Sequence, residues 1–92
     1  MNNIPTEYSL NQNYPNPFNP STTIRFGLPE NADVQVIIYD MVGNKVDVLV
    51  NDNLSAGYHT YSWNATNRAS GIYFCQMTTG KFTSVNKMLL IK

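Results

Sequence analysis

Short runs rich in Val, Ile, Thr, Tyr and Phe recur along this chain, and Gly, Asn and Pro interrupt them. Residues of the first kind favour strands, whereas those of the second kind favour turns. No stretch of about a dozen residues has the apolar spacing of three and four that an amphipathic helix requires. The pattern predicts an all-β chain with strands at residues 7–11, 22–28, 33–39, 45–50, 57–64, 71–79 and 81–91. Seven short strands in 92 residues favour an antiparallel β-sandwich.

Alternation within the third run indicates which of its side chains form the core. Val34, Val36 and Ile38 share one face, and the opposite face contains Gln35. Because successive side chains of a strand point to opposite sides, the aliphatic face is expected to point inward. The following residues, 40–44, include Gly and Asn and are expected to turn the chain.

The fifth run divides into a heavy apolar face and a lighter polar one. His59, Tyr61 and Trp63 share the first face, which we expect to be buried. Trp63 is predicted to occupy the centre of the core, and His59 is assigned to the core as a structural, hydrogen-bonding side chain.

The last two runs contain less regular patterns. In the sixth run the inward set is predicted to be Tyr73, Cys75 and Met77, because the other set contains the polar Gln76. In the last run alternation fails over residues 88–91, which are four consecutive apolar residues. Either a bulge or a strand that is apolar on both faces would explain this.

Composition limits the kinds of function that the chain can have. Six Lys and Arg balance six Asp and Glu without a basic cluster, so no nucleic-acid partner is predicted. One Cys and one His provide neither an internal disulfide nor a zinc-ligand set. No apolar run of about 18 residues occurs, so membrane insertion is not predicted. Since no nucleophile motif accompanies His59, and Cys75 lies inside a predicted strand, we expect no enzyme and no cofactor.

The length of the chain fits a single domain covering residues 1–92. Residues 1–6 lack the basic and apolar regions of a signal peptide and are expected to be a linker or a cloning remnant. We therefore expect the chain to be a piece of a larger protein.

An Asn/Pro segment, residues 13–20, precedes the second predicted strand. It contains three Pro and three Asn, which excludes a helix and makes a regular strand unfavourable. A fixed loop with Asn side chains capping backbone groups is predicted, in which Tyr14 and Phe18 cover one end of the sandwich.

Read together with the next strand, this segment resembles a known family. The run Asn13-Tyr14-Pro15-Asn16-Pro17-Phe18-Asn19-Pro20-Ser21-Thr22-Thr23-Ile24 is similar to the opening signature of type A C-terminal sorting domains of the type IX secretion system. Later segments fit the same family in order: Val34-x-Val36-x-Ile38-Tyr39-Asp40-x-x-Gly43, Gly57-x-His59-x-x-x-Trp63, Ser70-Gly71-Ile72-Tyr73-Phe74 and Lys87-Met88. The pattern is also similar to the immunoglobulin-like domain of flagellar hook-capping proteins.

The resemblance implies an immunoglobulin-like sandwich that follows an N-terminal cargo domain in a larger exoprotein. It also implies passage through the periplasm, recognition by type IX translocon components, removal by a sortase-like surface protease, and a final location at the cell surface or in the medium. The residues that we assign to recognition are Asn13, Tyr14, Pro15, Asn16, Pro17, Phe18, Asn19, Pro20, Gly71, Lys87 and Lys92. The structural core is assigned to Trp63, His59, Val36, Ile38 and Tyr73.

Other functions stay open at this point. The chain has six Tyr, four Phe and one Trp, which could form the binding face of a carbohydrate-binding or adhesion module of a secreted enzyme. An assembly domain of the hook-capping type is a further alternative. Loop carboxylates with Asn oxygens could hold Ca²⁺.

Overall fold

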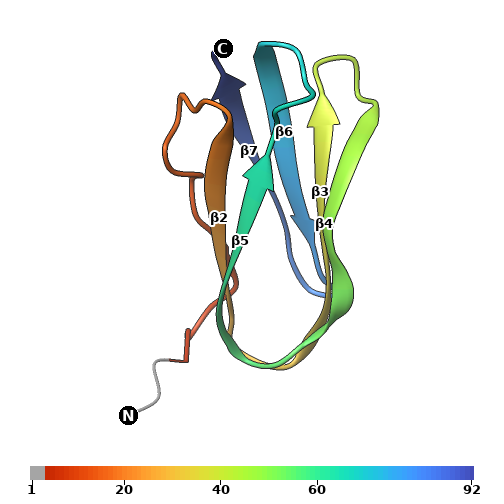
Figure 1. The fold of residues 1–92 in the computed structure, drawn as a ribbon. Helices are drawn as coiled ribbons and strands as arrows, with labels where there is room; N and C mark the ends of the chain where they lie inside the picture. Colours follow the sequence, from red (N-terminus) through yellow and green to blue (C-terminus); the bar gives the residue numbers. More distant parts are fainter. Residues whose placement is uncertain (1–3) are drawn as a thin grey trace.

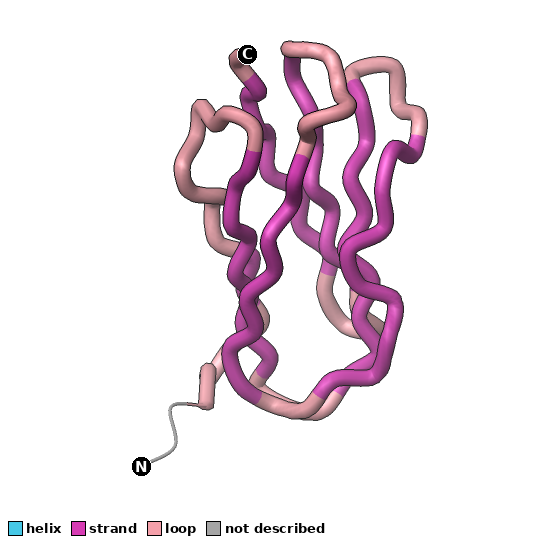
Figure 2. Tube along the Cα trace, viewed as in Figure 1, coloured by secondary structure: helices cyan, strands magenta, loops and turns pink. Residues whose placement is uncertain are grey.

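The computed structural model describes residues 4–92, which form two facing layers of strands (Figures 1 and 2). Residues 1–3, half of the expected linker, lie outside the described part. In residues 4–92 the secondary structure is all strand: β1 Ser9–Leu10, β2 Ser21–Leu28, β3 Ala32–Asp40, β4 Lys45–Leu54, β5 Gly57–Asn64, β6 Gly71–Thr78 and β7 Thr83–Leu90. A search of the same residues finds no helix that could span a membrane.

The seven strands pair into two antiparallel sheets. One sheet has the order β1-β2-β5 and the other has the order β4-β3-β6-β7. The predicted all-β, immunoglobulin-like sandwich is thereby confirmed. The inward faces of β3 and β6 are also as predicted, with Val34, Val36 and Ile38 on β3 and Tyr73, Cys75 and Met77 on β6 all buried.

The strand ends differ from the prediction where local hydrogen bonds replace sheet pairing. The last strand begins at Thr83 rather than at residue 81, because the Thr79 N–H donates to the Phe82 carbonyl at 2.8 Å and closes the hairpin. The first strand is only two residues long, and β4 continues to Leu54.

The apolar run near the end of β7 contains no bulge. Pairing with β6 is regular from Thr83 to Leu90, so Met88 and Leu90 point inward and are fully buried. Leu89 lies on the outer face and is half-buried. Of the two explanations, the strand that is apolar on both faces is correct, and the register shifts of this sheet lie between β3 and β4.

Trp63 lies in the core, with 1% of its surface exposed. Its ring contacts Phe18 and Tyr73, with ring centroids 5.8 and 5.4 Å away. The indole N–H donates to Asp47 Oδ2 at 2.9 Å, so the polar atom of this side chain is satisfied at the edge of β4. Trp63 therefore links both sheets and the Asn/Pro segment.

His59 lies on the predicted inward face of β5, but it is not fully buried, so its assignment to the core is wrong. The side chain is half-buried and stacks on Phe26 with ring centroids 5.5 Å apart. Its Nε2 lies 2.8 Å from the Ser55 carbonyl oxygen. His59 sits near the beginning of β5, where the sandwich opens to solvent, so the imidazole keeps a polar partner at the rim.

Cys75 is buried on the inner face of β6, and burial raises the pKa of its thiol to about 12. Because the thiolate is the reactive form, we expect a maleimide or iodoacetamide reagent at pH 7–8 to leave the folded protein unlabelled. Denaturant should restore rapid labelling of the same thiol. Rapid alkylation under native conditions, followed by mass spectrometry, would contradict this placement.

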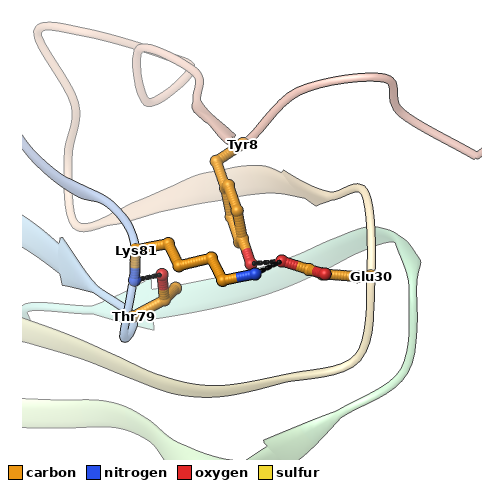
Figure 3. Close-up of polar contacts among 4 residues, drawn as sticks. All are labelled: Tyr8, Glu30, Thr79 and Lys81. Atoms are coloured by element: carbon orange, nitrogen blue, oxygen red, sulfur yellow. Dashed lines mark hydrogen bonds and ion pairs between the residues drawn. The ribbon is translucent and has the colours of Figure 1, made fainter.

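A cluster of polar side chains joins the segment before β1 to the two turns at the same end of the sandwich, which we call its base (Figure 3). The Tyr8 hydroxyl donates to Glu30 Oε2 at 2.6 Å, and Lys81 Nζ lies 3.1 Å from the same oxygen. The Tyr8 ring stacks on Phe82, with centroids 5.6 Å apart. This base clamp joins the segment before β1, the β2–β3 turn and the β6–β7 hairpin.

We expect the base clamp to depend on pH at both ends of the scale. The hydrogen bond from Tyr8 lowers the pKa of Glu30, and Lys81 lowers it further. The ionised Glu30 carboxylate therefore stabilises the clamp above the ordinary pKa of about 4.3, and this stabilisation is lost as the pH falls through the lowered pKa. Glu30 raises the pKa of Tyr8 and of Lys81, so their contributions are lost only as the pH rises above about 10.

Nuclear magnetic resonance can follow the clamp through the cross-peaks between the Tyr8 and Phe82 rings. They should weaken below about pH 4 in the parent, whereas in Glu30→Gln they should be weaker at neutral pH and insensitive to acid. An identical acid response in parent and variant would show that Glu30 does not control the contact.

Candidate functional site

The Asn/Pro segment lies along the outer edge of β7, at the end of the sandwich where the chain finishes (Figure 1). The Phe18 N–H donates to the Leu89 carbonyl at 2.9 Å, and the Ile91 N–H donates to the Phe18 carbonyl at 3.1 Å. The Leu89 N–H donates to the side-chain oxygen of Asn16 at 3.0 Å. Backbone groups that an edge strand would leave unpaired are thus satisfied by this segment.

The same segment is also bonded to β2 in the other sheet. Tyr14 and Thr23 exchange two backbone hydrogen bonds of 3.0 and 2.9 Å. Asn13 is buried, and its amide donates to Thr22 Oγ1 at 2.9 Å and to the Pro15 carbonyl at 3.2 Å. The segment therefore closes the side of the sandwich between β2 and β7, and its prolines leave few donors for a further strand.

Phe18 and Tyr14 differ sharply in burial. Phe18 is 2% exposed and packs against Trp63, as expected of a residue that covers the core. Tyr14 is 80% exposed, so the prediction that it also covers the core is wrong. The buried side chain of Asn13 occupies the inward position, and the next residue along an extended backbone points outward.

A shallow apolar groove of about 240 Å³ lies where the Asn/Pro segment meets the outer face of β7. Its lining combines residues from three places in the sequence: Asn16, Pro17, Ile72, Lys87, Met88 and Leu89. Lys87 is exposed at this groove, and its backbone carbonyl accepts a hydrogen bond of 2.8 Å from the Gln12 side chain. Among the described residues, the Lys87 ammonium takes part in no ion pair.

The structure brings only some of the predicted recognition residues together. Asn16, Pro17 and Lys87 line the groove. Gly71 pairs with Leu90 and has φ of +151°, a conformation that favours glycine. Lys92 lies over the 65–70 loop, where its N–H donates to Ser70 Oγ at 3.0 Å and its ammonium bonds to the Thr66 carbonyl.

The recognition residues assigned from the sequence lacked three residues of the groove, Ile72, Met88 and Leu89. Ile72 and Leu89 lie on the outer face of the four-stranded sheet and are paired with each other across β6 and β7. Alternation counted from Lys87 would have placed Leu89 on the same outward face, so the signal was present in the last run.

The chemistry of the groove follows from the few groups that line it. Within residues 4–92, no three or more His, Cys, Asp or Glu side chains gather in a way that could hold a metal ion. What the groove offers is an apolar floor, an amide from Asn16 and one cation from Lys87. The groove thus combines apolar surface with one hydrogen-bonding group and one positive charge.

Comparison with known proteins identifies a family whose match spans the groove residues. The family described as the secretion system C-terminal sorting domain matches residues 12–92, which include the Asn/Pro segment and all of β2 to β7. No curated protein sequence matches the chain. Since the match covers most of the chain, this protein belongs to the family of C-terminal sorting domains of the type IX secretion system.

Proposed function

We propose that this domain is a non-catalytic export signal, and that type IX translocon components read it at the groove between the Asn/Pro segment and β7. Family membership supports a sorting signal in a larger exported protein, whose destination is the cell surface or the medium. In this proposal the groove is the surface of the domain that the translocon components bind.

One observation carries the proposal: the Asn/Pro segment both completes the fold and forms the groove. Asn16 and Pro17 lie beside Lys87 and Leu89 where Phe18 is bonded to Leu89 and Ile91. An unfolded chain separates these residues by about 70 positions, so the signal exists only in the folded domain. Such a signal would let the secretion machinery distinguish a folded sorting domain from an unfolded one.

The chemistry of the groove indicates the partner that fits it. Ile72 and Leu89 offer apolar surface. The ammonium of Lys87, which forms no ion pair within residues 4–92, favours a carboxylate nearby. The receptor segment is therefore apolar with an acidic residue at its rim. Gly71 and Lys92 act indirectly, by holding the 65–70 loop beside the end of β7.

The cargo would join at the opposite end of the sandwich. Figure 1 shows the first described residues, which precede β1, at the end of the sandwich opposite the Asn/Pro segment and the end of β7. A cargo domain placed before residue 4 leaves the groove accessible. The domain would cross the periplasm with its cargo, and a sortase-like protease at the surface would cut the chain before the base clamp.

We expect a reporter that carries this domain at its C-terminus to be exported by a type IX-competent cell and to stay in the periplasm of a translocon mutant. Within the competent cell, Lys87→Glu should lower the secreted fraction about tenfold, because it places like charges at the rim of the interface. Export is measured by immunoblotting of medium, surface and periplasmic fractions.

Lys45→Glu is the matched control, since Lys45 is an exposed lysine on β4 and does not line the groove. Exposed lysines contribute little to stability, so the thermal midpoints of both variants should stay close to the parent value. Equal export from the competent strain and the translocon mutant would refute the sorting function. Full export of Lys87→Glu would refute the groove as the surface that is read.

A further inference from the structure

A second hollow lies on the outer face of the three-stranded sheet, away from the groove at β7. It measures about 480 Å³ and is lined mainly by polar side chains: Ile4, Ser9, Asn11, Arg25 and Tyr58. β2 and β5 form its floor and lie side by side in the sheet (Figure 1). β1 and the residues that flank it form its wall.

Two contacts order this hollow. The Arg25 guanidinium carbon lies 4.2 Å from the centroid of the Tyr58 ring, so the fork is stacked on an aromatic surface. The Asn11 N–H donates to the Arg25 carbonyl at 2.9 Å, which fixes the wall against β2. Among the described residues, the Arg25 guanidinium pairs with no carboxylate.

Gly27 allows these groups to approach one another. A Cβ at this position would lie 2.9 Å from Ser9 Oγ, 2.9 Å from Pro5 Cγ and 3.1 Å from Tyr58 Cε1. Any side chain would push the wall and the Tyr58 ring apart. The close packing of Ser9 and Tyr58 therefore depends on a residue without a side chain.

We propose that this hollow binds a sugar that carries a carboxylate. A stacked guanidinium presents its N–H groups in the fork geometry that a carboxylate accepts. The hollow is much larger than a carboxylate alone requires, and the hydroxyl of Ser9 and the amide of Asn11 can bond to sugar hydroxyls. An extended peptide fits less well, because the edge of β2 at this wall is already paired with Ser9, Leu10 and Asn11.

Sodium glucuronate is the probe, with glucose, acetate and phosphate as comparisons at equal ionic strength. Nuclear magnetic resonance titration of the protein with glucuronate should give saturable chemical-shift changes at Arg25, Tyr58, Ser9 and Asn11. The dissociation constant should be on the order of 1 mM. Glucose, acetate and phosphate should each bind at least about tenfold more weakly.

Two substitutions separate charge from geometry. Arg25→Gln should abolish the shifts, and Arg25→Lys should weaken binding at least about tenfold because it keeps the charge but loses the fork. Lys45→Gln, which removes a distant cation, should leave binding unchanged, and thermal midpoints verify that each variant is folded. Absence of saturable shifts, equal binding of phosphate or glucose, or full binding by Arg25→Gln would overturn the proposal. Export through the groove at β7 does not depend on this site, so the two proposals can fail separately.

Discussion

Replacing Trp63 with alanine is expected to lower the free energy of unfolding by about 3–5 kcal/mol. The ring is almost fully buried, and it contacts Phe18 from the Asn/Pro segment and Tyr73 from the opposite sheet. Alanine would leave a cavity at the point where these three parts meet, and the Asp47 carboxylate would lose the indole donor. Since whole domains are stable by only about 5–15 kcal/mol, this is a large fraction of the total.

Chemical denaturation followed by circular dichroism measures the effect. The comparison requires that the unfolding free energies of parent and variant depend equally steeply on denaturant concentration. Trp63→Phe is the matched control, because it keeps an aromatic ring but loses the hydrogen bond to Asp47, and it should cost less than Trp63→Ala. An unchanged midpoint for Trp63→Ala would contradict the burial of this residue. An exposed Trp63 would instead support the carbohydrate-binding alternative, which requires aromatic side chains at the surface.

The sheets could be predicted because strand periodicity is a local property. Val34, Val36 and Ile38 form an all-aliphatic set, whereas the opposite face of β3 contains Gln35, and this difference indicates which face is buried. The depth of a residue along a strand is not local. His59 shares a face with Trp63, but it lies at the open end of the sandwich, and the sequence contains no signal for that distance from the centre.

The site was harder to predict because it depends on contacts between distant segments. Composition identified residues 13–20 as a fixed loop, yet no local rule pairs Phe18 with Leu89 across 71 positions. Asn16 was expected to cap nearby backbone, and it accepts a hydrogen bond from β7 instead. The different burial of Tyr14 and Phe18 depends on how the segment pairs with β2 and with β7, which aromatic content alone does not indicate.

Removal of residues 88–92 is expected to abolish the folded state. Met88 and Leu90 are fully buried, and loss of each comparable side chain costs about 2–5 kcal/mol. The truncation also removes the hydrogen bonds that hold Phe18 and Asn16 at the edge of β7. The combined loss is similar to the whole stability of a small domain, so the shortened chain should show no cooperative thermal transition by circular dichroism.

Removal of Lys92 alone is the control for shortening the chain. It keeps both buried residues and every bond between the Asn/Pro segment and β7, so its transition should stay cooperative. In the export experiment, the 88–92 truncation should leave the reporter in the periplasm because the groove no longer forms. Lys87→Glu should give the same localisation with an intact fold, and this difference separates the loss of the signal from the loss of the domain. A truncated chain that unfolds at the parent midpoint would show that β7 does not complete the sandwich, and the groove would then need another support.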